Sequence, residues 1–315
     1  MKNFKILFIL MLSAFMGMQF VSCSSDDDEN TDLKTPLYES ASAKYKITES
    51  SADIQSIELT ASGNYIIVKK YGYYAPGKRS LAYNIFMHRE ESTRATAYDN
   101  IVYGKFVNLG DNKYDLEGWG IVTITQSEGE YVNISIVKDG KEEVFGARKE
   151  EQFKSSTATD NLCRSWEISK MGIAVEIGGR KFDKMANHDN LKGLFKDYIN
   201  WLIEQSAPGV EVPEEEINEL INEYINQYNA AKPLYVIFTK SGSYMVHYTN
   251  EIIGISTWRW ENENENVIRY SWDHSDINNG GTCDISYSGN MLLVKETQIA
   301  NGAKVSVTYG MTEIK

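Results

Sequence analysis

The chain has 315 residues, a length that fits two domains of ordinary size. Its hydrophobic fraction of 42% and charged fraction of 24% are those of a globular protein, which excludes wholesale disorder. The formal net charge of −12 argues against non-specific nucleic-acid binding, because a phosphate backbone requires a basic surface.

The first 22 residues have the pattern of an export signal. Lys2 and Lys5 precede an apolar run from Ile6 to Phe20. That run is shorter than the roughly 20 residues that cross a bilayer as a helix. A basic start, a short apolar region and then small residues are typical of a secretory signal peptide, so residues 1–22 are left out of the fold prediction.

The end of this segment, Phe20-Val21-Ser22-Cys23, resembles the lipobox of bacterial lipoproteins. Phe20 departs from the aliphatic residue that is usual three places before the cysteine. The resemblance implies that Cys23 becomes the mature N-terminus and carries acyl chains such as palmitate. An ordinary signal peptide with an incidental Cys23 is the alternative.

Residues 23–37 form a polar, acidic stretch with the run Asp26-Asp27-Asp28-Glu29. Like charges in a short run repel one another and stay solvated, which predicts a tether. Directly after an acylated cysteine, the run also resembles the acidic export tag of Bacteroidota surface lipoproteins. Together these features predict a protein anchored by lipid to the outer membrane and exposed at the cell surface.

The rest of the chain contains an internal repeat. Residues 57–68 and 236–247 match at an offset of 179, with an apolar strand, a Ser-Gly turn and an aromatic-led strand in each. The identical pairs are Thr60/Thr239, Ser62/Ser241, Gly63/Gly242 and Tyr65/Tyr244. Each segment predicts a β-hairpin, and further aromatic strands and Gly turns follow in the same order in both halves. The pattern therefore indicates a duplication.

Short strands with turn signals every 8–12 residues predict a mainly β protein with two tandem antiparallel β-barrels or sandwiches. The order of an early Trp, the Ser-Gly hairpin and a Trp-rich strand resembles the lipocalin-like domains of Bacteroidota lipoproteins. The first half has Tyr45 where that pattern has its early Trp. The predicted domains are 38–153 and 161–315, joined by a small, polar linker at about 154–160.

A two-helix insertion is predicted in the second domain at about 187–231. Leu191, Leu194, Tyr198 and Leu202 recur at helical spacing, and Pro208-Gly209 interrupts that pattern. A second amphipathic segment begins after Pro213, with three acidic residues in its first turn, where the helix dipole favours them. The pair is interpreted either as a packed cap or as a lid over a ligand cavity.

Four aromatic residues of the second domain are the strongest candidates for ligand binding. Trp258 and Trp260 share one face of a strand by alternation, and Tyr270 and Trp272 share one face of the next. The opposite faces carry Arg259 and other polar residues, which favours an inward orientation. Inward rings either fill the barrel or line an apolar cavity, whereas outward rings make a stacking platform.

Cys163 and Cys283 are the other two thiols of the chain. Export permits a disulfide between them, and two buried free thiols are the equally weighted alternative.

Candidate chemistry is sparse elsewhere. The serines of the Ser-Gly turns lie in hairpins and not in a nucleophile elbow, and no close His pair or Ca²⁺-binding loop is present in the sequence. We therefore predict no catalytic residues, no metal site and no cofactor. The expected function is binding of a small apolar molecule, a glycan or an envelope protein. A structural or assembly role in a surface complex is the alternative, and a carbohydrate-active or other hydrolase is third.

Overall fold

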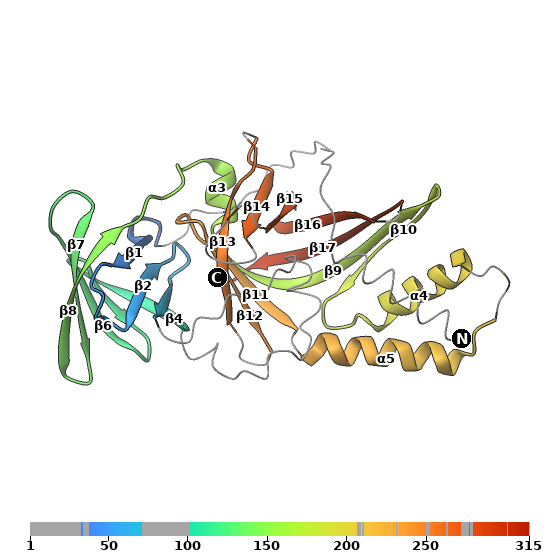
Figure 1. Cartoon of the computed structure of the whole chain (residues 1–315), viewed down its shortest axis with the longest axis horizontal. Coiled ribbons are helices and arrows are strands. Elements are labelled where there is room, and N and C mark those ends of the chain that lie inside the picture. The colour runs from blue at the N-terminus through green and yellow to red at the C-terminus, as the bar shows by residue number, and fades with distance from the viewer. Residues whose placement is uncertain are drawn as a thin grey trace.

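The computed structural model describes Leu33 and residues 38–70, 101–206, 209, 211–230, 232–249, 253–262, 264–271, 277, 280–300 and 302–314. These residues form two closed eight-stranded antiparallel barrels in tandem, so the predicted mainly β class is confirmed. Figure 1 shows the two barrels one after the other along the long axis of the molecule. The leader, Cys23 and Trp272 lie outside the described residues.

Barrel 1 follows a short 3-10 turn at Glu39–Ala41 and has an up-and-down strand order, closed by the pairing of its first strand with its last. Its strands are β1 (Ala43–Ile47), β2 (Ile54–Leu59), β3 (Asn64–Lys69), β4 (Ile101–Gly110), β5 (Lys113–Leu116), β6 (Gly120–Gln126), β7 (Tyr131–Lys138) and β8 (Lys141–Lys149). The inward positions of these strands supply a separate apolar core.

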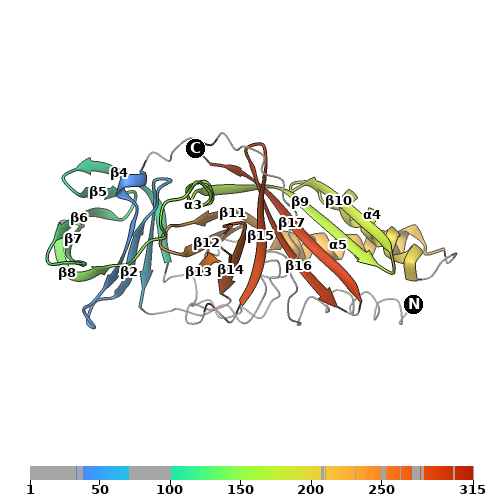
Figure 2. The same ribbon diagram turned by 90° about the horizontal axis from the view of Figure 1, so that it is seen from above.

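Barrel 2 has the same order and closes between its first and last strands. Its strands are β9 (Ser165–Ile177), β11 (Pro233–Phe238), β12 (Ser243–Tyr248), β13 (Ile253–Trp260), β14 (Val267–Ser271), β15 (Gly280–Ser288), β16 (Met291–Ala300) and β17 (Ala303–Glu313). An additional strand, β10 (Arg180–Asn187), pairs with the second part of β9 and extends the sheet beyond the barrel. Figure 2 shows β9, β10, β16 and β17 continuing away from barrel 1.

The two repeat hairpins have the same hydrogen bonds. In barrel 1 the Thr60 amide donates to Asn64 O at 2.8 Å, and the Gly63 amide donates to Thr60 O at 3.1 Å. The corresponding bonds in barrel 2 are Thr239 N to Ser243 O at 2.9 Å and Gly242 N to Thr239 O at 3.1 Å. Gly63 and Gly242 have φ values of 79° and 76°, which L side chains rarely adopt. Equal strand order and equal turn geometry support the duplication.

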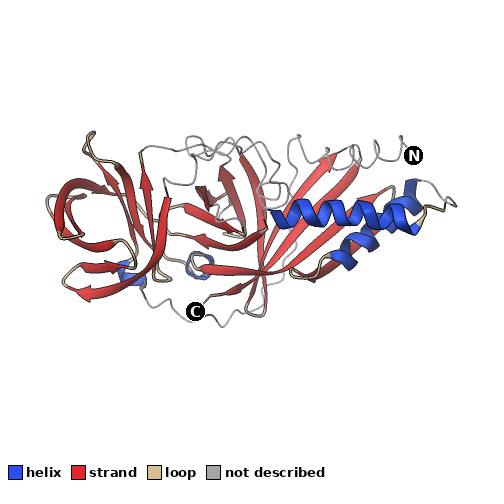
Figure 3. Ribbon diagram, turned by 90° about the horizontal axis from the view of Figure 1, so that it is seen from below, coloured by secondary structure: helices blue, strands red, loops and turns tan. Residues whose placement is uncertain are grey.

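The insertion between β10 and β11 contains helices α4 (Lys192–Ser206) and α5 (Glu214–Ala230), as predicted. Figure 3 shows both helices beside the extended strands, at the end of the molecule away from barrel 1. Their apolar stripes are buried in the core of barrel 2, with Leu194, Tyr198 and Leu202 from α4 and Ile221 from α5. The helices are therefore part of the packed core of barrel 2.

The linker between the barrels is more ordered than its small, polar composition predicts. It contains a short helix, α3 (Thr157–Leu162), and Ser156 is the N-cap, whose Oγ accepts from the Thr159 amide at 3.0 Å. A serine that accepts from the amide three residues on satisfies one of the unpaired amides at the helix start. The linker prediction is corrected accordingly: part of 154–160 is helical and packed between the barrels.

Candidate functional site

The aromatic residues predicted to bind ligand lie mainly inside barrel 2. Trp258 is 2% exposed and Tyr270 is fully buried. The ring of Trp258 packs edge-on against Phe238 and Trp260, with centroids 5.8 Å and 5.4 Å apart. Its indole N–H donates to Thr239 O at 3.2 Å. The inward orientation is confirmed for Trp258 and Tyr270, and their surfaces are covered by other side chains of the protein.

Trp260 is half-buried, and its indole N–H donates to Thr159 Oγ1 of α3 at 2.9 Å. Trp272, the fourth predicted residue, lies outside the described residues. Two of the four rings thus fill the barrel, and a third packs against the linker helix. The three described rings do not form an exposed stacking platform.

A buried polar cluster lies beside these rings in the interior of barrel 2. Glu296 is 5% exposed, and its Oε1 accepts from Tyr270 Oη and from Gln298 Nε2, both at 3.1 Å. The hydroxyl of Tyr309 is buried beside that of Tyr228. Burial, and then the neighbouring Tyr228, raises the pKa of Tyr309 well above its usual value.

This cluster was not predicted from the sequence, although the sequence contains one signal for it. Leu292, Val294 and Glu296 occupy alternate positions of β16, so the carboxylate of Glu296 continues an apolar, inward-facing series. A charged residue in such a series predicts a buried, hydrogen-bonded group.

His188 connects the insertion to the same region. It is 4% exposed, and its Nε2 makes a short hydrogen bond with the hydroxyl of Tyr228 on α5. Burial, assisted by the charge of Lys232, lowers the pKa of His188 to about 4. The imidazole is therefore neutral at physiological pH and acts as a hydrogen-bonding contact between the end of β10 and α5.

Cys163 and Cys283 are both buried free thiols in the structure. This is the second of the two alternatives that the sequence left open. Burial raises the pKa of each thiol well above its usual value, which makes both unreactive as nucleophiles.

Within the described part of the chain, no group of three or more His, Cys, Asp or Glu side chains has the arrangement of a metal site. The same residues include no helix that is both long and apolar enough to cross a membrane.

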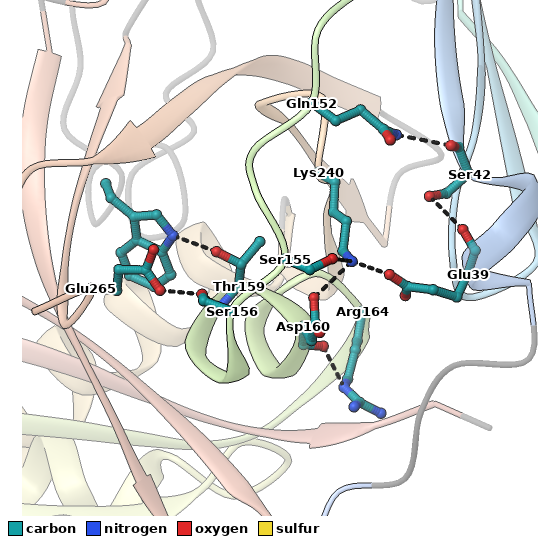
Figure 4. A network of polar contacts seen from close by, with 11 residues as sticks. Glu39, Ser42, Gln152, Ser155, Ser156, Thr159, Asp160, Arg164, Lys240 and Glu265 are labelled. Carbon is teal, nitrogen blue, oxygen red and sulfur yellow. Dashed lines mark hydrogen bonds and ion pairs between the residues drawn. The ribbon is translucent and has the colours of Figure 1, made fainter. Parts of the chain in front are cut away.

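The junction between the barrels contains a network of polar contacts, shown in Figure 4. Lys240, in the repeat hairpin of barrel 2, has a side chain that is only 5% exposed. Its ammonium group pairs with Glu39 of barrel 1 and, at 2.7 Å, with Asp160 of α3, and it donates to Ser155 Oγ at 3.1 Å. Burial alone lowers the pKa of Lys240, but the two carboxylates outweigh it and the pKa is raised. One cation thus joins both barrels and the linker.

An apolar cluster lies beside this network and joins the outer faces of the two barrels. It contains Ile66 and Val68 of β3 and Ile237, Met245 and Ile255 of barrel 2. These side chains point away from their own barrel interiors, by the alternation of each strand, and are buried because the other barrel covers them. The cluster will be called the inter-barrel contact.

Equivalent positions of the repeat meet across this junction. Lys44 Nζ donates to Ser243 Oγ at 3.1 Å, and Asn64 Nδ2 donates to Ser165 Oγ at 3.4 Å. Asn64 corresponds to Ser243 in the repeat hairpins. Lys44 and Ser165 also correspond, because Lys44 pairs with Glu58 and Ser165 pairs with Ile237 at the equivalent position. The two barrels therefore contact each other through the same face in opposite directions, as the subunits of a two-fold dimer do.

Barrel 1 carries most of the exposed large apolar side chains among the described residues. Five of the seven exposed large apolar residues among the described residues lie on its outer surface: Val107, Leu109, Tyr131, Val137 and Val144. These five residues will be called the outer face of barrel 1. They lie on β4, β7 and β8, and Val144 is 61% exposed.

No protein-family model matches the chain, and no curated protein is significantly similar to it.

Proposed function

We propose that this protein is a lipid-anchored binding protein of the bacterial cell envelope that contacts a partner protein through the outer face of barrel 1. The anchor is inferred from Cys23 and the residues before it, whose pattern resembles a lipobox. Two or three acyl chains hold a protein durably on a membrane, because each buried CH₂ contributes about 0.8 kcal/mol.

The packing of barrel 2 favours a partner at the surface over a small molecule enclosed at the predicted rings. Trp258 and Tyr270 are buried by Phe238, Trp260 and other protein side chains, and Glu296 is hydrogen-bonded to Tyr270. Rings that pack against one another at interior density leave no room for a ligand between them. Of the three ligand classes expected from the sequence, an envelope protein then fits best.

The outer face of barrel 1 is the observation that carries this proposal. Strand register places Val107 opposite Asp115, Asp115 opposite Ile121, and Ile121 opposite Val137, in one row across β4 to β7. With strands about 4.8 Å apart, this row is about 14 Å long. Val144 lies diagonally across from Val137. Val107, Val137 and Val144 thus share one sheet surface with polar residues between them, which is typical of a protein-binding surface, whereas Leu109 and Tyr131 lie farther along β4 and β7.

Native mass spectrometry of the full-length protein extracted from its own host membrane tests both parts of the proposal. The expected result is a chain that begins at Cys23, carries acyl mass and retains a bound protein. An unmodified Cys23 would contradict the proposed lipid anchor. A retained small molecule without a protein partner would contradict protein binding by barrel 1 and favour ligand binding in barrel 2.

A matched pair of variants tests the surface. Val144→Lys places a charge on the outer face of barrel 1, whereas Met185→Lys places one at a 43% exposed site on β10 of barrel 2. The first is expected to lose the bound protein and the second to retain it. If both variants retain the bound protein equally, the outer face of barrel 1 is not the surface that binds it.

A further inference from the structure

Glu58 is a buried carboxyl group at the junction of the barrels. Its side chain points outward from β2, on the face opposite the inward residues Ile57 and Leu59, yet Glu58 is only 2% exposed. Barrel 2 covers it, with Thr239 and Ser243 of the repeat hairpin nearby. Neither carboxylate oxygen has a hydrogen-bond partner of standard geometry among the described residues, although the hydroxyls of Thr239 and Ser243 lie near enough to favour the charged form.

The repeat shows which residue this position holds in the other barrel. Glu58 pairs with Ile66 in the first hairpin, and Ile237 pairs with Met245 at the same place in the second. Ile237 is fully buried in the inter-barrel contact. Barrel 1 thus has an ionisable group where barrel 2 has an apolar side chain, although both positions are covered by the opposite barrel.

The groups around Glu58 do not offset its burial. Burial raises the pKa of Glu58 above the usual 4.5. Lys44 of β1 opposes the shift, as do the hydroxyls of Thr239 and Ser243, while Glu150 adds to it. The ammonium group of Lys44 lies 3.5 Å from a carboxylate oxygen of Glu150 and also donates to Ser243, so its charge is shared.

The other charged groups described at the junction are the network around Lys240 and the ion pair of buried Arg164 with Glu313, at 2.7 Å. Lys240 is paired with Glu39 and Asp160, and the nearby thiol of Cys163 is neutral because burial raises its pKa. Among the described residues, the cation that favours a charged Glu58 is Lys44, and Lys44 already has another carboxylate partner in Glu150.

We propose that Glu58 makes the docking of the two barrels sensitive to pH, so that the neutral carboxyl group permits the inter-barrel contact and its ionisation weakens it. The proton is bound by Glu58 in the docked state and released to solvent when the barrels separate. A group with a higher pKa in the docked state favours docking at low pH. Docking is therefore strongest below the ordinary glutamate pKa and weakens as pH rises above it, by about tenfold in the docking equilibrium for each unit of pKa difference.

Small-angle X-ray scattering of the full chain at about pH 5 and about pH 9 measures the separation of the barrels. The native protein is expected to have a larger radius of gyration at the higher pH, and its thermal unfolding to change from one transition toward two. Glu58→Gln keeps the shape and removes the charge, and Glu58→Ile places there the residue of the other barrel. Both variants are expected to remain docked at both values of pH.

Glu143→Gln is the matched control, since Glu143 is an exposed glutamate on β8 of barrel 1 and is not among the groups that shift the pKa of Glu58. It should retain the native response to pH. The proposal is overturned if the native protein has the same dimensions at both values of pH, or if Glu58→Gln responds to pH as the native protein does. The glutamine side chain has nearly the same shape as the glutamate side chain, so we expect Glu58→Gln to fold. Its folded state is verified at low pH before its response to pH is compared with that of the native protein.

Discussion

Gly280 is required by the close approach of two strands in barrel 2. A Cβ atom built at this position would lie 1.6 Å from the carbonyl oxygen of Tyr270 on the neighbouring strand, and that atom is backbone that cannot rotate away. Gly280→Ala would force β14 and β15 apart. We expect a loss of about 1–3 kcal/mol in the free energy of unfolding, measured by urea denaturation, because overpacking in a close-packed region has that cost.

Gly193 provides the opposite case for the same substitution. It lies in α4, and a Cβ atom there would meet no other atom within 4 Å. Gly193→Ala should be neutral or stabilising by up to about 1 kcal/mol, since alanine has the higher helix propensity. If Gly280→Ala leaves the free energy of unfolding unchanged, β14 and β15 are spaced widely enough at Gly280 to accept a Cβ atom.

At the scale of single residues, the alternation of residues along a strand predicted which way a side chain faces. It did not predict whether a domain distant in the sequence covers that side chain. Trp258 was expected to face inward because Arg259 and Ile255 share the opposite face, and it does. Glu58 gave no such signal, because an outward glutamate next to inward Ile57 and Leu59 is the pattern of an exposed face. Its burial arises from barrel 2, which follows much later in the chain.

At the scale of elements, the two inserted helices were predictable and β10 was not. Apolar residues at helical spacing identify α4, whereas β10 has a single buried residue, Phe182, among mostly charged and polar neighbours. A strand held mainly by backbone pairing to β9 leaves little hydrophobic periodicity in the sequence. The insertion was therefore expected to begin at about 187, after the strand that in fact opens it.

The attachment of α5 through His188 predicts a loss of stability in acid. The folded state holds the pKa of His188 at about 4, below its ordinary 6.5, so the unfolded state binds the proton more readily between these values. Stability should therefore fall as pH drops from about 6.5 to about 4. His188→Gln should be less stable than the native protein at neutral pH but should lose less on acidification, measured by thermal unfolding.

Glu58 and His188 respond to acid in opposite directions, which separates their effects experimentally. Acid stabilises docking through neutral Glu58 and destabilises the insertion through His188. If His188→Gln keeps the full acid sensitivity of the native protein, the contact with Tyr228 does not control the attachment of α5.

At the scale of the whole molecule, the duplication could be predicted from the sequence, but the way the two copies meet could not. Matching Ser-Gly hairpins give the repeat and its strand order. The contact depends on the outward residues of those hairpins, Ile66, Met245 and Ile237, which read in isolation as ordinary apolar strand positions. Only the fold shows that both copies use the same face, in an arrangement like that of two subunits related by two-fold symmetry.

That arrangement makes Met245 a test of whether the barrels act as one body. Met245 is fully buried in the inter-barrel contact, but it lies on the outer face of barrel 2 and contributes nothing to that barrel's interior. Met245→Glu would place an unpaired carboxylate among Ile66 and Ile255, at a cost of several kcal/mol if the contact stayed closed.

Met185→Glu makes the same change at a 43% exposed position. We expect Met245→Glu to increase the radius of gyration and to divide thermal unfolding into two transitions, while near-ultraviolet circular dichroism from buried Trp258 persists. Met185→Glu should leave all three unchanged. Native dimensions for Met245→Glu at neutral pH would mean that the apolar contact does not hold the two barrels together.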